Sequence, residues 1–531
     1  MNQSFESREA LISNENDDYV DYRGRKADPR KHGGVRAASL ACIVELIQSL
    51  VFFGNSANLV RYFLQYMHYS VAQSSNMLTN FMGTSFLLSI VAGYINDTVL
   101  STLIAFIVYV SIELLGFILL TYQATHSNLL PSENETPSYI QAAVLYIGLG
   151  AIAIGIGGTK ATLPTHGANQ LDPNKQNLIS SFFNWYYFSI NTASIFAATL
   201  MVWIEENCGW GWSFTISAIL VFCSISIFSS GSRIYRLKQP AGSPLKGLIK
   251  VIVASTRKTI DAAAVQVYHN DKEQSYAKET SYNKFKFLNK ALKDDTIEVS
   301  QVEDTKAFLG LLPIFATTIV LNCCVAQLMT FSVQQGNFMN RKISNFTITT
   351  QSISVIPLFF ILGTIGLIEK SKDLYSNTGA TYNKFYQPLV RMGVGLTLTA
   401  VSMAVAAVVE SWRLAELNKG YAISVFWLTG QNFLLVLSEV FAVGGMLELF
   451  YSDAPNGMKS VSTSLSWCSI SLGYFLSSVL VTVCNSVSGR FGQAWIEGQD
   501  LNHDRLDLFY ALLCLLSLLN VILYVYFAKR Y

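Results

Sequence analysis

The chain has 531 residues, of which 51% are hydrophobic and only 14% are charged, and its formal net charge is +2. Soluble domains carry about 25% charged residues, so this composition excludes an ordinary soluble protein and indicates a polytopic membrane protein. The eight cysteines form no CxxC pair and no cysteine–histidine metal spacing. We therefore expect no metal, no cofactor and no nucleic-acid partner.

The chain begins with a polar segment, residues 1–36, which mixes acids and bases and has little to bury. Such a composition predicts a mobile tail. Residues 237–300 form a second polar, lysine-rich stretch, inside which residues 244–258 have apolar side chains at helical spacing. We expect a short interfacial helix there, because the segment is too charged to span a bilayer.

Two groups of long apolar segments follow the tail and the linker. A helix needs about 20 mostly apolar residues to cross a bilayer. The sequence predicts such spans at about 39–64, 74–95, 101–122, 140–160, 180–203, 212–230, 307–333, 347–368, 390–409, 422–449, 461–485 and 506–528. They fall into one bundle within residues 37–236 and another within 301–531.

The distribution of lysine and arginine predicts the orientation. These residues are dense in the tail, the linker, residues 369–391 and the C-terminal end, and absent near 67–73, 123–138 and 204–211. The positive-inside rule then places both termini and the linker in the cytosol. An all-α fold with twelve spans in two six-helix bundles is the pattern of the major facilitator architecture, in which the substrate site lies near the midplane between the halves.

A few ionisable residues interrupt the apolar spans, and such residues in a membrane usually mark a functional site. They are Glu45 in the first span, Glu113 in the third, Lys160 in the fourth, and Glu439 and Glu448 in the tenth. Structural readings remain open for several: Lys160 could snorkel, Glu448 could be a solvated cap and Glu113 could join helices. A glutamate–lysine pair across the cavity would satisfy both charges, and protonating the glutamate would release the lysine.

Several motifs give the chain a family resemblance. The stretches GIGGTK (155–160) and SFFNWYYFSIN (181–191), together with FLGLLPIFATTIV (308–320) and LELFYSDAPNGMKS (447–460), resemble signature segments of the proton-coupled oligopeptide transporter family. They are most similar to its plant nitrate and peptide transporter branch. The segments RGRKADPRKHGG (23–34) and FFGNSANLV (52–60) resemble most the subgroup that includes carriers of abscisic acid and other hormones, and of nitrate. The resemblance extends from about residue 20 to the end.

The resemblance implies roles for individual residues. It places Lys160 in the substrate cavity and Glu439 where peptide-carrying relatives hold an amino group, and we expect Tyr187 and Asn191 to contact the substrate as well. Glu45 corresponds to the first glutamate of the family's proton-coupling ExxER motif. Glu303 and Lys306 correspond to a gate at the cytosolic mouth of the seventh span.

The chain departs from the patterns of the family and its relatives in three places. Gln48 and Ser49 replace the second glutamate and the basic residue of ExxER, which weakens the case for the usual proton coupling. Val325 and Ala326 occupy the stretch in which a nitrate-carrying relative has a histidine. Asp97 is kept from the facilitator loop motif, whereas the glycine and arginine that normally follow it are not.

Together these features predict a secondary transporter of a small anion, nitrate or a carboxylate hormone such as abscisic acid, with protons and the lipid bilayer as its other partners. A ligand-binding transceptor with little flux and a di- or tripeptide proton symporter are the alternatives. We do not expect the protein to be an enzyme, because the sequence shows no nucleophile–base pair, metal-binding cluster or phosphate-binding loop. The plasma membrane is the expected location, and the sequence leaves the oligomeric state open.

Overall fold

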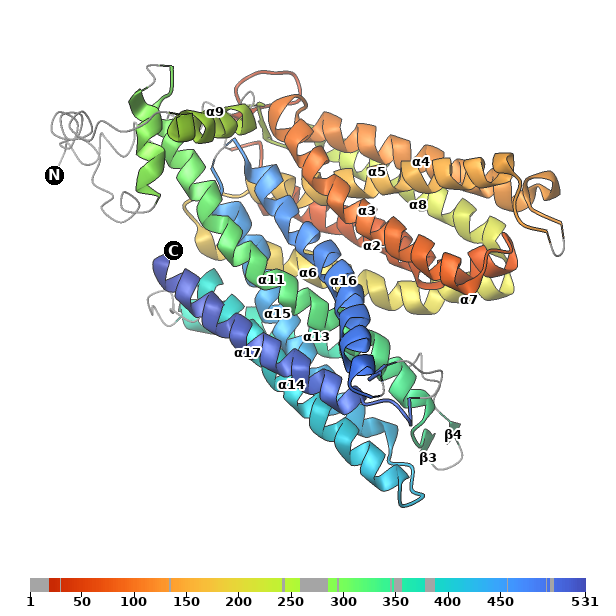
Figure 1. Cartoon of the computed structure of the whole chain (residues 1–531). Helices are drawn as coiled ribbons and strands as arrows, with labels where there is room; N and C mark the ends of the chain where they lie inside the picture. Colours follow the sequence, from red (N-terminus) through yellow and green to blue (C-terminus); the bar gives the residue numbers. More distant parts are fainter. Residues whose placement is uncertain are drawn as a thin grey trace.

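Long helices make up most of the chain (Figure 1). The computed structural model describes residues 19–28, 30–132, 135–240, 244–257, 285–293, 296–343, 346–347, 356–377, 387–455, 457–492, 494–496 and 501–531. Within these residues, 11 helices are long and apolar enough to cross a membrane. The helix α13 adds one more, and the all-α facilitator-type fold is thereby confirmed.

The N-terminal bundle contains helices separated by short loops. They are α2 (Val35–Gln65), α3 (Val71–Thr98), α4 (Thr102–Thr125), α5 (Tyr139–Asn169), α6 (Gln176–Phe196), which continues through the π-helix η2 (Ala197–Met201) into α7 (Val202–Asn207), and α8 (Trp210–Ser230). Ser70 and Ser138 begin α3 and α5 with complete capping boxes, in which the serine and a glutamine three residues later satisfy free backbone groups.

The C-terminal bundle follows the linker. Its helices are α11 (Val299–Asn337), α13 (Ile356–Asn377), α14 (Pro388–Leu417), α15 (Leu428–Ser452), α16 (Lys459–Arg490) and α17 (Leu506–Arg530). The expectation that the eighth span begins at residue 347 is wrong. Thr347 lies in the strand β4 (Phe346–Thr347), which pairs with β3 (Lys342–Ile343), and the described part of α13 begins at Ile356.

The tail is ordered from residue 19, which corrects the expectation of mobility for that part. The strand β1 (Tyr19–Val20) pairs with β2 (Leu237–Lys238), which directly follows the N-terminal bundle. The backbone N–H of Gly33 donates to the Ile234 carbonyl at 2.7 Å. These backbone hydrogen bonds were not visible in the sequence, because nothing in the local composition favours a two-residue strand. Residues 1–18 lie outside the described part.

The linker contains α9 (Pro244–Arg257) and the short helix η4 (Lys286–Lys293). Val251 of α9 packs with Leu288 and Ala291 of η4 and with Val302 at the start of α11. The linker helices are therefore attached to the C-terminal bundle through a small apolar cluster. Ile249, on another face of α9, remains exposed.

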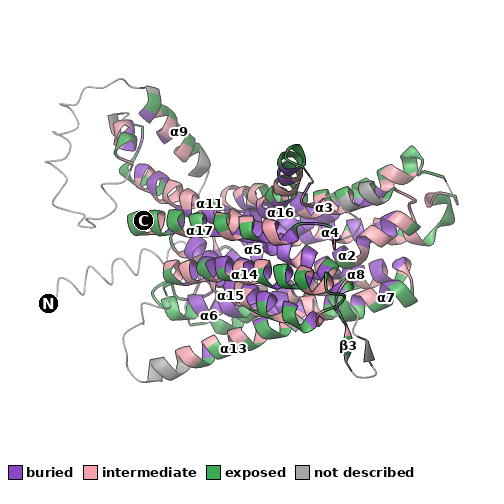
Figure 2. Ribbon diagram, turned by 60° about the horizontal axis from the view of Figure 1, so that its bottom comes forward, coloured by how far each residue is buried: buried purple, intermediate pink, exposed green. Residues whose placement is uncertain are grey.

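Buried residues gather where helices pack, and exposed residues cover the outside of both bundles (Figure 2). Many of the exposed side chains on the long helices are large and apolar, including Leu115, Ile147, Ile219, Leu367 and Ile522. A soluble protein would not leave so much contiguous apolar surface in water. A bilayer would cover these side chains.

The two bundles meet through contacts near one end of their helices. Both oxygens of the Asp97 carboxylate, on α3, accept from the backbone N–H groups of Ser460 and Val461 in the first turn of α16, at 3.2 and 3.0 Å. Tyr451 donates to Asn169 at 2.7 Å, and the Thr165 and Thr463 hydroxyls lie 2.9 Å apart. The Asp97 contact places a carboxylate where the backbone groups of a helix start are free.

That end carries the ordered tail, the linker helices and the C-terminus (Figure 1). Ser471 of α16 donates to the Gly83 carbonyl of α3 at 3.0 Å, near the middle of both helices. Toward the opposite end, which carries β3 and β4, the two bundles diverge (Figure 1). The structure is thus closed on the side that the charge distribution predicts to be cytosolic.

Candidate substrate and proton site

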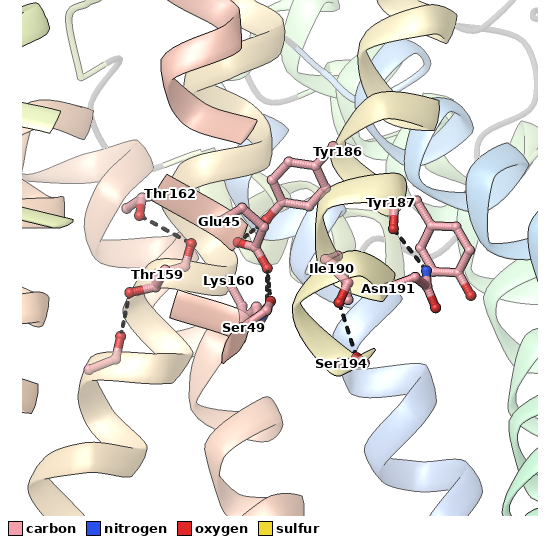
Figure 3. Close-up of polar contacts among 11 residues, drawn as sticks. Glu45, Ser49, Thr159, Lys160, Thr162, Tyr186, Tyr187, Ile190, Asn191 and Ser194 are labelled. Atoms are coloured by element: carbon pink, nitrogen blue, oxygen red, sulfur yellow. Dashed lines mark hydrogen bonds and ion pairs between the residues drawn. The ribbon is translucent and has the colours of Figure 1, made fainter. Parts of the chain in front are cut away.

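Lys160 and Glu45 form an ion pair in the interior of the N-terminal bundle (Figure 3). Lys160 comes from α5 and Glu45 from α2, and their side chains are 2% and 0% exposed. Lys160 is therefore not a residue that snorkels to the membrane surface. A buried charge pair is maintained only when its remaining hydrogen-bonding capacity is also satisfied.

Two hydroxyl groups complete the pair. The Ser49 hydroxyl, one turn from Glu45 on α2, donates to Glu45 Oε1 at 2.7 Å, and Lys160 Nζ lies 3.1 Å from the same Ser49 oxygen. The Tyr186 hydroxyl, from α6, donates to Glu45 Oε2 at 2.6 Å. Ser49 stands at the position where the family resemblance implies a basic residue. Its hydroxyl is hydrogen-bonded to both members of the ion pair.

The pair lies on the face of the bundle that meets the other half. Lys160 is about 13 Å along the helix axis from the Asn169 end of α5, which is close to the middle of a bilayer. Its ammonium lies 4.4 Å from the ring centroid of Trp467, a residue of α16 in the C-terminal bundle. This cation–π contact is favourable for a desolvated lysine. Any motion between the bundles must therefore change the surroundings of Lys160.

A second polar group lies on the other side of α6. Tyr186 points toward Glu45, whereas the adjacent Tyr187 points away from it and lies beside Asn191 (Figure 3). The Asn191 side-chain amide donates to the Tyr187 carbonyl at 2.8 Å. Tyr187 is also close enough to Glu439 of α15 to interact with it electrostatically. The helix α6 therefore connects the lysine pair to the face of the C-terminal bundle.

Glu439 keeps access to solvent although its helix lies at the centre of the molecule. Its side chain is half-buried, and Tyr474 of α16, which is 37% exposed, is near enough to interact with it electrostatically. Among the described contacts, Glu439 makes no ion pair. An ionisable residue within a membrane-spanning helix usually marks a functional site, which makes Glu439 a candidate.

The gate residues form a pair within one helix. Lys306 Nζ lies 2.7 Å from Glu303 Oε1, three residues earlier on α11, and the lysine side chain is buried. This contact lies near the start of α11, at the end that the charge distribution predicts to be cytosolic. Their role in gating stays a prediction, since this ion pair does not itself join the two bundles.

A cluster that the sequence did not reveal does join the bundles. Arg391 of α14 is 1% exposed and donates to Glu448 of α15 at 3.0 Å. It also donates to Ser180 at 3.3 Å and to Asn184 at 2.8 Å, and both of these residues belong to α6 of the other bundle. Glu448, which the sequence left open as a solvated cap, is in fact a buried ion-pair partner.

A second ion pair extends this cluster. Glu369 and Lys372, on α13, lie 3.1 Å apart. Glu369 accepts from the Asn184 amide at 2.5 Å, and Lys372 donates to Ser180 at 2.8 Å. We call Ser180, Asn184, Glu369, Lys372, Arg391 and Glu448 the cytosolic cluster, after the side on which the charge distribution predicts them to lie. Its signal in the sequence was weak, because the charged residues lie near predicted span ends, where charges are common.

Comparisons with known proteins identify the family. The model of the POT family matches residues 103–496. The chain belongs to the POT family. The family resemblance predicted from the sequence is confirmed, and the chain is a multi-pass membrane protein of a transporter family.

The POT family relatives include plant proteins of the same length. The chain is 47% identical to Protein NRT1/PTR FAMILY 4.2 of Arabidopsis thaliana, over 97% of this chain and 98% of that protein. It is also 47% identical to Protein NRT1/PTR FAMILY 4.1 of the same plant, over 97% and 98%. The crystal structure of the POT family transporter PepTSo is 18% identical and superimposes with a TM-score of 0.65, covering 93% of this chain and 98% of that one. This likeness concerns the fold.

Within the described residues, no group of three or more histidine, cysteine, aspartate or glutamate side chains is arranged to hold a metal ion. The polar residues near the midplane are instead arranged as an ion pair, hydroxyl donors, aromatic rings and an accessible carboxyl. This set can bind a small charged solute and exchange protons, but it offers no nucleophile activated by a base.

Proposed function

We propose that this POT family member is a secondary active transporter of small anionic solutes, nitrate or a carboxylate hormone such as abscisic acid, by alternating access. The observation that supports this most is the buried Lys160, paired with Glu45 and facing Trp467 between the bundles. A lysine near the midplane supplies a positive charge in the interior of the protein, away from both membrane surfaces. An anion can use that charge only when Glu45 gives it up.

The ion pair then couples the anion to a proton. While Glu45 is ionised, it neutralises Lys160 and competes with any anion for it. Protonation of Glu45 removes this competitor and frees the ammonium group. By linkage, a proton on Glu45 strengthens anion binding, and a bound anion strengthens proton binding by the same factor. We infer symport from this reciprocity, with Glu45, the carboxyl that remains of the degenerate ExxER motif, carrying the proton that releases Lys160.

The contacts between the bundles support an outward-facing resting state. Asp97, Thr165, Tyr451 and the cytosolic cluster all hold the bundles together at the predicted cytosolic end. Transport to the cytosol requires these contacts to break while the outer ends approach each other, as in rocking-bundle transport. This orientation, with both termini in the cytosol and the protein in the plasma membrane, belongs to the proposal.

A zwitterionic solute is the second candidate, and Glu439 favours it. A carboxyl that is accessible to water and makes no described ion pair could bind an amino group, as the family resemblance implies for peptide carriers. Glu439→Gln separates the two candidates. It should abolish uptake of a zwitterion such as a dipeptide and leave uptake of nitrate or abscisic acid largely intact.

The direct test is uptake of labelled nitrate and labelled abscisic acid by oocytes that express the protein, at acidic and at neutral external pH. Wild-type protein should show uptake above uninjected cells, greater at acidic pH, and Lys160→Ala should lose it. Lys175→Ala, which removes an exposed lysine from the loop before α6, is the matched control and should transport normally. Unchanged uptake of every anion in Lys160→Ala would contradict the assignment. Specific binding without flux would favour the transceptor.

A further inference from the structure

Glu113 is a buried carboxyl that the proposed coupling between Lys160 and Glu45 does not use. It lies in the middle of α4 and is 0% exposed. The helix α4 packs against α5 and α8, and an added Cβ on Gly155 of α5 would collide with the Glu113 side chain. The carboxyl is therefore held between helices, away from both membrane surfaces.

The group that faces Glu113 is the side-chain amide of Gln48, from α2. In one of the two orientations open to the amide, its nitrogen faces Ser224 of α8 and donates to the hydroxyl at 2.7 Å, and Ser224 in turn donates to the Val221 carbonyl at 2.8 Å. The amide oxygen of Gln48 then lies 3.0 and 3.1 Å from the two oxygens of Glu113. An ionised carboxylate would repel that oxygen, whereas a protonated Glu113 would donate a hydrogen bond to it.

Rotating the amide by half a turn gives a second complete arrangement. The Gln48 nitrogen would then donate to both Glu113 oxygens at the same 3.0 and 3.1 Å, and the Gln48 oxygen would accept from Ser224 at 2.7 Å. This arrangement fits an ionised Glu113, because both carboxylate oxygens accept. The two orientations of the Gln48 amide thus match the two protonation states of Glu113, because the amide oxygen can accept from a protonated carboxyl and the amide nitrogen can donate to a carboxylate.

Glu113 is also coupled to the ion pair. Its charged neighbours within electrostatic reach are Lys160 on α5 and Glu45 on α2, while α8 contributes the neutral Ser224. An ionised Glu113 would be attracted by Lys160 and repelled by Glu45. Since protonation of Glu45 removes that repulsion, the charge on Glu113 depends on the state of the pair, and the two carboxyls titrate as a coupled system.

We propose that Glu113 is a second proton-binding carboxyl of the transport cycle and that the Gln48 amide reorients with its proton. This rests on the proposed function, because it adds a proton to the same site.

Infrared difference spectroscopy on the purified protein in lipid bilayers tests the proposal without any substrate. The C=O stretch of a protonated carboxyl is resolved from the carboxylate bands, so a change of pH should reveal a band that titrates. We expect this band to be lost in Glu113→Gln and retained in Glu205→Gln, which removes another buried glutamate of the same bundle. In Gln48→Leu, in which Glu113 loses its acceptor, the band should move to higher frequency; this variant also serves if Glu113→Gln fails to fold.

A wild-type protein without a titrating band that depends on Glu113 would overturn the proposal, whatever the transport results. If the band is present but no anion is transported, the proposed function fails and the titration of Glu113 stands. Where uptake is measured, Glu113→Gln should keep substrate exchange but show a shallower dependence on pH, with a proton Hill coefficient near one. A purely structural role would not change that slope.

Discussion

At the scale of single residues, the proposed function depends most on the ion pair between Lys160 and Glu45. Both side chains are almost completely buried, and hydroxyls from Ser49 and Tyr186 satisfy Glu45. Desolvating two charges costs several kcal/mol per ion, so such a pair adds little net stability. We attribute its presence in the bundle interior to the proposed function, in which a proton on Glu45 breaks the pair and releases Lys160.

Removing one partner should therefore be worse than removing both. Lys160→Met leaves a buried, unpaired carboxylate, and we expect a loss of about 3–5 kcal/mol of stability at neutral pH. The double variant Glu45→Gln/Lys160→Met should recover most of that loss while remaining inactive. Thermal unfolding of the three proteins in detergent measures this, and a double variant no more stable than Lys160→Met would contradict the assigned pairing.

The sequence predicted the residues of the pair but not its surroundings. Lys160 and Glu45 stand out because charged residues are rare within apolar spans. Trp467 and Tyr186 do not stand out, because aromatic residues are common in membrane helices and only the packing shows which ones face a charge. Glu113 and Gln48 can be singled out in the sequence, but their contact, and that of Gln48 with Ser224, depends on how α2, α4 and α8 pack together.

At the scale of helices, glycines hold α4 against α5. A Cβ on Gly116 would lie 2.8 Å from the Gly148 carbonyl oxygen and 3.0 Å from the Ile152 backbone nitrogen. These are backbone atoms and cannot move aside without shifting a helix. Small residues are the usual means of bringing membrane helices close together. The close contact fixes the helix that carries Glu113 relative to the one that carries Lys160.

Gly116→Ala should consequently destabilise the N-terminal bundle by about 1–3 kcal/mol, as overpacking does. Gly150→Ala is the matched control, because a Cβ on Gly150 of α5 would meet nothing within 4 Å. Melting curves in detergent compare the two. Equal melting temperatures for both variants would show that the close approach of α4 and α5 does not matter for stability.

Hydropathy located the helices well, since a bilayer demands long apolar segments whatever the fold. It failed where a backbone partner decides the structure. The pairing of β1 with β2 and of β3 with β4 involves two residues on each side, too few to leave a pattern. The same holds for the π-helix η2, which appears within an apolar segment without a distinctive composition.

At the scale of the whole molecule, the two bundles are joined on one side and diverge on the other (Figure 1). The cytosolic cluster connects α6 of the N-terminal bundle with α13, α14 and α15 of the C-terminal bundle. These contacts must be exchanged for water when the cytosolic side opens. In the proposed transport cycle, these contacts therefore stabilise the outward-facing state relative to the inward-facing state.

Arg391→Gln should shift that balance toward the inward-facing state. A loss of about 1.4 kcal/mol from the outward-facing state changes the population ratio about tenfold. A cysteine introduced by Thr463→Cys, at a contact between the bundles, should then react faster with a membrane-impermeant maleimide from the cytosolic side. Unchanged labelling would show that the cytosolic cluster does not hold the bundles together.

Arg413→Gln is the control for this experiment. Arg413 is as buried as Arg391, and it donates to both oxygens of Glu410 at 2.8 Å. Arg413 and Glu410 both belong to α14, so their ion pair does not join the two bundles. The loss of Arg413 should lower stability without increasing the labelling of Thr463→Cys. A similar increase in both variants would mean that general destabilisation, rather than the cluster, exposes the contact.

The coupling between the proton on Glu45 and the anion at Lys160 is tested most directly by accumulation of labelled anion in proteoliposomes under an imposed pH gradient. If Glu45 exchanges a proton as Lys160 binds the anion, wild-type protein should concentrate nitrate or abscisic acid on the alkaline side, above protein-free liposomes. Glu45→Gln should still exchange labelled for unlabelled anion but should not concentrate it. Concentrative uptake of equal size in Glu45→Gln would contradict the coupling between the ion pair and the proton.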